Sequence, residues 1–186
     1  SPPKPVKIAG NVDTDKKQVA LSFDAAWGNE QTEHLLEILD KYKVKSTFFL
    51  VGDWVKNYPD SVKDIAKHGH DGAITATPIR NDADVIVRLV GQIQSCNEKI
   101  KELTGKTPTL FRAPYGDYNN DVVKSVNGCN MYCVQWDVDS LDWKDPTPTD
   151  KAEYYEKNQE RQYYMMHNGA KNTPEALPTV IEAIKS

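Results

Sequence analysis

Three polar residues in distant parts of the chain each follow a short apolar, strand-like run. They are Asp24, Arg112 and His167. In folds built from repeated strand–helix units, the residues that follow strands collect at one end of the sheet, where active sites lie. A carboxylate, a guanidinium and an imidazole gathered there have the chemistry of a hydrolase. The sequence therefore predicts one hydrolytic site to which all three residues contribute.

Each of these groups has a plausible task. The Asp24 carboxylate could take a proton from water if a rigid fork of donors, such as that of Arg112, held it ionised and aimed. Residues 112–116 form a turn that Pro114 stiffens, and the backbone N–H of Tyr115 could face a developing oxyanion. The alternative that Asp24 merely caps the next turn stays open at this point.

An acidic and aromatic stretch follows the predicted strand at residues 131–137. An acid from this stretch next to His167 would keep the imidazole protonated, as a general acid requires. Trp143 would form a wall of the site or stack on a sugar ring. Most of the acids in this part of the chain, with Asp137 and Asp145 among them, are expected to face water.

The spacing of apolar residues predicts the elements that must position these groups. Strands are expected where short apolar runs occur, and helices where apolar residues recur every three or four positions. Alternating strands and helices imply an α/β fold with a parallel sheet, open or closed into a barrel. The expected strands are 18–23, 45–51, 109–112, 131–137 and 161–166. The expected helices are 32–42, 59–68, 83–103, 119–126 and a final one that Thr173 caps and Pro174 begins.

Composition narrows the class of protein. The 186 residues suit one domain, expected at 16–186 after an extended lead-in at 1–15. The net charge of −4 argues against nucleic acid and acidic membranes as partners. No run approaches the roughly 18 apolar residues of a membrane span, and no signal peptide is visible. The three cysteines are expected to be buried free thiols.

Four ordered segments carry a family resemblance that runs over nearly the whole chain. They are 22–28, 111–117, 136–143 and 166–172. Together they resemble the motifs of polysaccharide deacetylases of the NodB-homology type, carbohydrate esterase family four, and look closest to the sporulation-type branch. The resemblance implies a distorted (β/α) barrel with fewer than eight repeats. Such a barrel could be open at its C-terminal end.

The resemblance also implies an activity, which is metal-assisted hydrolysis of N-acetyl groups on the amino sugars of a cell-wall or chitin-like polysaccharide. It implies a zinc- or cobalt-class metal and an extracellular or cell-envelope location. The protein is expected to be a monomer. The implied site residues are a general base (Asp24), a residue that orients it (Arg112), an oxyanion donor (Tyr115), a general acid (His167) tuned by Asp142, and the acetyl-pocket residues Trp143, Pro114 and Met165.

The metal site departs from the family pattern. Ala25 stands where the first motif usually has a metal-binding Asp, and residues 72–79 contain no histidine where the second motif usually has two. Three explanations stay open: a metal-free pseudoenzyme that binds glycans, a relocated metal held by His68 or His70, or an error in residues 72–82 of the sequence. An esterase that acts on acetylated xylan is a further alternative.

Overall fold

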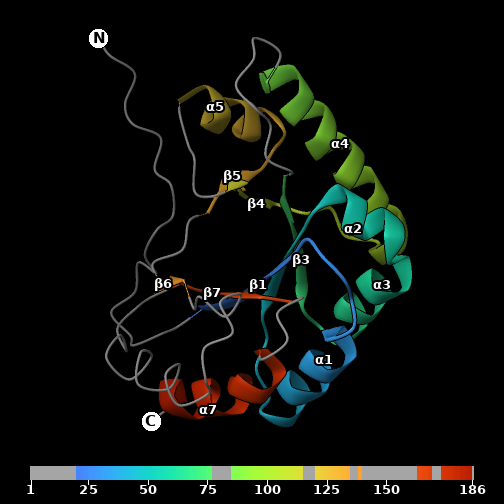
Figure 1. Ribbon diagram of the computed structural model, residues 1–186. Coiled ribbons are helices and arrows are strands. Elements are labelled where there is room, and N and C mark those ends of the chain that lie inside the picture. Colours follow the sequence, from blue (N-terminus) through green and yellow to red (C-terminus); the bar gives the residue numbers. More distant parts are fainter. Residues whose placement is uncertain are drawn as a thin grey trace.

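The computed structural model describes residues 20–76, 85–114, 120–134, 138–139, 163–168 and 173–185 (Figure 1). Within these residues the strands form one parallel sheet in the order β5-β4-β3-β2-β1-β7-β6. The strands are β1 (Ala20–Ala25), β2 (Thr47–Leu50), β3 (Asp71–Thr75), β4 (Leu110–Arg112), β5 (Tyr132–Cys133), β6 (Val138–Asp139) and β7 (Tyr163–His167).

Helices cover the outside of this sheet. Figure 1 shows α2, α3 and α4 gathered along one side, with α1 and α7 below the strands. The helices are α1 (Thr32–Lys41), α2 (Gly52–Asn57), α3 (Pro59–Lys67), α4 (Val85–Thr104), α5 (Asn120–Gly128) and α7 (Thr173–Lys185). In the described chain, none of them is long and apolar enough to cross a membrane.

The two faces of the sheet have different surroundings because successive strand residues point to opposite sides. One face, the helix-side core, includes Phe23, Phe48 and Phe111, packed with apolar residues of the surrounding helices. The other face has a much smaller apolar cluster around Phe49 and Ala73. The predicted site residues Asp24 and Arg112 alternate with the helix-side residues, which places them on this second face.

The α/β fold class is confirmed, and the departures from the predicted elements have local causes. Strand β3 was not predicted, because Asp-Gly-Ala-Ile-Thr lacks the run of β-branched and aromatic residues that marks a strand. The strand expected at 131–137 is described only at its start, as β5. The lead-in at 1–15 lies outside the described residues.

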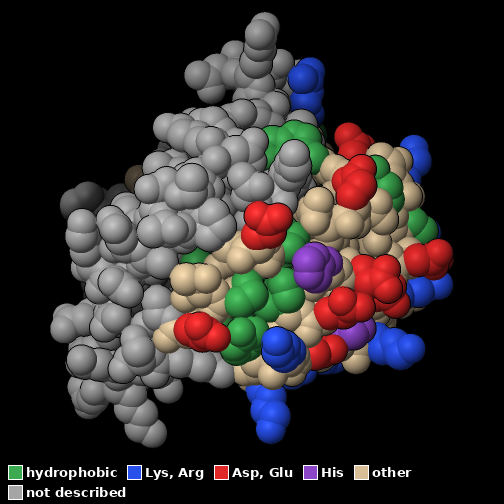
Figure 2. All heavy atoms as spheres, turned by 60° about the horizontal axis from the view of Figure 1, so that its bottom comes forward, with side chains coloured by type: hydrophobic (Ala, Val, Ile, Leu, Met, Phe, Trp, Pro, Cys, Tyr) green, Lys and Arg blue, Asp and Glu red, His purple; other side chains and the backbone are tan. Residues whose placement is uncertain are grey.

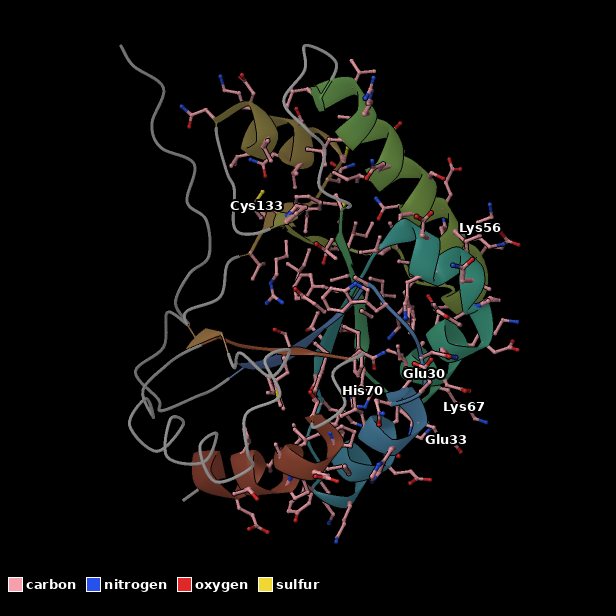
Figure 3. All side chains as sticks on the ribbon, in the orientation of Figure 1. Glu30, Glu33, Lys56, Lys67, His70 and Cys133 are labelled. Carbon is pink, nitrogen blue, oxygen red and sulfur yellow. The ribbon has the colours of Figure 1, made fainter. Side chains whose placement is uncertain are left out.

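His70, which the sequence interpretation considered as a ligand of a relocated metal, lies in the interior of the protein. It is 3% exposed and packs against Phe48. Its Nδ1 accepts a hydrogen bond from the Ser46 backbone N–H at 3.1 Å, so the neutral ring carries its proton on Nε2. Figure 3 places His70 by β3, inside the helix layer. Burial, with a contribution from the Lys45 charge, lowers the pKa of His70 to about 4.

This environment predicts a loss of stability in mild acid. The folded pKa of about 4 lies below the ordinary 6.5, so the stabilisation is complete above pH 6.5 and declines as pH falls toward 4. We expect a loss of about 3 kcal/mol across that window, measured by urea unfolding at a series of pH values. The variant His70→Gln should flatten the curve, whereas His34→Gln, at an exposed position on α1, should not. A wild-type curve that is level from pH 7 to 4.5 would contradict this assignment.

Candidate active site

The site is built around a charged pair that spans the sheet. The Arg112 guanidinium, at the end of β4, donates from Nη1 to Asp24 Oδ1 at 2.6 Å and from Nη2 to Ser22 Oγ at 2.7 Å. The Arg112 side chain is 1% exposed and that of Asp24 19% exposed. Two strands, β2 and β3, lie between β4 and β1, so the arginine reaches across both. The carboxylate is thereby fixed in position and still accessible from one side.

The Phe49 ring packs against the Arg112 guanidinium. The guanidinium carbon lies 3.9 Å from the centre of the Phe49 ring, within the range of a cation–π contact. Thr75, in register with Arg112 on β3, donates its hydroxyl to the Arg112 carbonyl at 2.8 Å. Stacking and hydrogen bonding together hold the guanidinium in one orientation. The group can therefore aim Asp24 rather than merely neutralise it.

The backbone places His167 directly beside Asp24. Strands β1 and β7 are parallel neighbours, and Asp24 and His167 are register partners. The backbone N–H of Asn168 donates to the Asp24 carbonyl at 2.9 Å, which extends the pairing past the strand end. Parallel pairing thus brings the third predicted residue level with the charged pair, one strand away.

Asn168, which the sequence interpretation did not select, ties this end of β7 to the segment after β1. It is fully buried, and its amide nitrogen donates to Thr32 Oγ1 at 2.9 Å and to the Gly28 carbonyl at 3.5 Å. Ser22 was also missed, although it has the same strand parity as Asp24. A polar residue two positions before Asp24, and an amide just after His167, were the available signals.

Loss of the Asn168 amide is expected to loosen this connection. In Asn168→Ala the Gly28 carbonyl and the Thr32 hydroxyl lose a buried partner, which costs about 1–3 kcal/mol of unfolding free energy. Urea unfolding measures it. The matched control is Asn127→Ala, at an exposed position on α5, which should change stability by less than about 0.5 kcal/mol. Equal effects of the two substitutions would remove the special role assigned to Asn168.

The other predicted site residues are placed only in part. Pro114 is half-buried, two residues beyond the end of β4. The backbone of Met165 is in register with Ser22 on the neighbouring strand. Tyr115, Asp142 and Trp143 lie outside the described residues.

The described residues at the expected metal position do not fit a metal. Ala25, Leu50, Ile74 and Phe111 are register partners across four adjacent strands, and they form a continuous apolar row. Each is at most 1% exposed and belongs to the helix-side core. None of these side chains carries an oxygen or nitrogen donor. Within the described parts of the chain, no three His, Cys, Asp or Glu side chains cluster closely enough to hold a metal ion.

The two histidines considered for a relocated metal are engaged elsewhere. His68 Nδ1 lies 2.5 Å from Asp40 Oδ2 in a surface pair. His70 precedes β3 and packs against Phe48 in the helix-side core, on the face opposite Asp24. Neither one can contribute to a metal centre at the Asp24–Arg112 pair without rearrangement of the fold.

The comparison with protein families agrees with this geometry. The model of the polysaccharide deacetylase family matches residues 11–134. The chain belongs to the polysaccharide deacetylase family. Among its relatives, the uncharacterised protein YlxY of Bacillus subtilis is 35% identical over 98% of this chain and 57% of its own length. The peptidoglycan-N-acetylmuramic acid deacetylase PdaA of the same organism is 29% identical. The matched region covers 92% of this chain and 68% of the length of PdaA.

Solved structures of the family confirm the fold and include inactive members. A CE4 family pseudoenzyme from Bacillus anthracis, BA3943, is 32% identical with a TM-score of 0.86, over 92% of this chain and 61% of that protein. A mutant of BA3943 with restored enzymatic activity gives the same TM-score at 34% identity. The Bc1960 peptidoglycan N-acetylglucosamine deacetylase is 29% identical with a TM-score of 0.81, over 92% of this chain and 83% of that one. The distorted barrel is therefore common to active and inactive relatives.

Proposed function

We propose that this chain removes N-acetyl groups from amino sugars of a cell-wall polysaccharide, acting as a monomer at the cell envelope. The observation that carries the proposal is the fixed Arg112–Asp24 pair, with His167 beside it on the adjacent strand. Named relatives that act on peptidoglycan support this class of substrate. The net charge of −4 suits an uncharged or mixed-charge partner, and Figure 2 shows acidic and basic side chains side by side on one face of the protein.

The proposed reaction uses side chains of this chain for each proton transfer. Asp24, aimed by Arg112, takes a proton from water as the water oxygen adds to the acetyl carbonyl carbon. The backbone N–H of Tyr115 stabilises the oxyanion. His167, kept protonated by Asp142, donates to the leaving nitrogen as the C–N bond breaks, giving acetate and a free amine.

The acetyl group would lie in a small pocket near these residues. We assign Trp143, Pro114 and Met165 to its walls. Members of this family generally use a divalent metal, but the apolar row at Ala25 and Ile74 offers no donors for one. No step of the proposed reaction is therefore assigned to a metal.

Acetate release tests the proposal. Purified protein is incubated with N-acetylglucosamine oligomers and with peptidoglycan, once with added zinc or cobalt and once with a chelator. We expect Asp24→Asn to lower the rate at least about 100-fold, because it removes the base, whereas Asp53→Asn, at an exposed position on α2, should leave it unchanged. Wild-type release no faster than that of Asp24→Asn would refute the hydrolase.

A second candidate is a metal-free domain that binds glycans without hydrolysing them. Two observations favour it: the donor-free row at the metal position and the similarity to the BA3943 pseudoenzyme. It predicts calorimetric binding of the same oligomers, no acetate release, and no stoichiometric zinc in elemental analysis. Tight one-to-one zinc would rule it out.

A further inference from the structure

An exposed indole, that of Trp27, lies three residues along the chain from Asp24 of the charged pair. Among the described residues, the large apolar side chains that remain exposed are Trp27 at 60%, Val87 at 73% and Tyr132 at 69%. Trp27 comes three residues after Asp24, a distance that an extended chain spans in about 10 Å. It is the one of these three that directly follows β1, the strand that carries Asp24.

The backbone that carries Trp27 is firmly held. The neighbouring Gly28 carbonyl accepts hydrogen bonds from Trp54 Nε1 at 3.2 Å and from the Asn168 amide at 3.5 Å. The Ala25 carbonyl, two residues earlier, accepts one from the Val51 N–H at 3.2 Å. Trp54 itself is 1% exposed. The exposed indole is therefore presented on a pre-organised segment, which lowers the entropic cost of binding a ligand.

A carboxylate lies next to the same backbone. Glu30 is exposed, and its side chain folds over Gly28, where an added Cβ would lie 2.6 Å from Glu30 Oε1. Figure 3 labels Glu30 beside the beginning of α1. An aromatic face and a carboxylate acceptor on the same short segment match a pyranose ring, which has an apolar C–H face and hydroxyl donors at its edge.

We propose that Trp27 is a stacking platform for a second sugar ring of the polysaccharide, next to the ring whose acetyl group lies at the Asp24–Arg112 pair. Glu30 accepts a hydrogen bond from a hydroxyl of that second ring. The occupant is an N-acetylated amino sugar in a chain of at least two units. This inference rests on the proposed function, because it takes the same glycan as the ligand.

Calorimetry with N-acetylglucosamine oligomers tests the platform. We expect Trp27→Ala to weaken binding about tenfold and Trp27→Phe to recover part of the loss, since a smaller aromatic face remains. Glu30→Gln should weaken binding less than Trp27→Ala. The matched control is Tyr132→Ala, which removes an equally exposed aromatic side chain from β5 and should not change the affinity. Unchanged urea midpoints for all four variants show that folding is intact.

The outcomes separate this inference from the function on which it rests. If wild type binds the oligomers and Trp27→Ala binds them equally well, the platform is wrong and the proposed function stands. If Trp27→Phe binds the oligomers as weakly as Trp27→Ala does, the assignment of a stacking contact is wrong. If wild type binds no oligomer, both the platform and the glycan ligand are overturned.

Discussion

Replacement of Arg112 by methionine is expected to lower the free energy of unfolding by about 3 kcal/mol. The substitution removes the guanidinium from the Asp24 carboxylate, and removal of one member of a buried pair costs about 3–5 kcal/mol. We take the low end because the Asp24 side chain is 19% exposed and water can partly solvate it. Urea unfolding at pH 7 measures the change.

Two further variants show whether charge burial is the cause. Adding Asp24→Asn to Arg112→Met should recover part of the lost stability, because an unpaired amide costs less to bury than an unpaired carboxylate. Lys124→Met removes a long cation from an exposed position on α5 and should have an effect below about 0.5 kcal/mol. If Arg112→Met costs less than about 1 kcal/mol, the pair does not hold the site together.

Introduction of aspartate at Ala25 is expected to destabilise the protein by about 3 kcal/mol without creating a metal site. Ala25 is fully buried, in register with Leu50 and, one strand further on, with Ile74. A lone carboxylate there would be desolvated and unpaired, which is strongly unfavourable. A single donor among aliphatic side chains cannot satisfy zinc, which takes three or four ligands. Thermal unfolding with and without zinc measures both effects.

The neighbouring residue provides a matched control. Ala26 is exposed, so Ala26→Asp adds the same charge one position along the chain and should be nearly neutral. A zinc-dependent rise in the melting temperature of Ala25→Asp, absent in Ala26→Asp, would contradict the conclusion that the site lacks ligands.

These two variants bear on the choice between hydrolase and glycan-binding domain in different ways. Arg112→Met tests the carboxylate of Asp24, which the arginine holds in position. Ala25→Asp tests the part that departs from the family, the metal position. A domain that uses the site only to bind glycans would need the positioned carboxylate but would not need a metal. Acetate release by the wild-type protein then decides whether the positioned carboxylate performs chemistry.

The amino-acid sequence was sufficient to predict the parallel α/β architecture and the family. Both depend on local patterns: apolar runs followed by polar residues, helical spacing, and short ordered motifs. For the same reason it placed Asp24, Arg112 and His167 at strand ends. The absence of an aspartate at position 25 and of histidines in residues 72–79 was also visible in the residue types alone.

Other features required the folded chain, because they depend on strand order and register between segments far apart in sequence. Arg112 contacts Asp24 and Ser22 across two intervening strands, at separations of 88 and 90 residues. Asn168 reaches Thr32 over 136 residues. The burial of His70 and the apolar row from Ala25 to Phe111 likewise follow from which strands become neighbours. Local periodicity shows which face of a strand is apolar, but long-range pairing determines which side chains meet there.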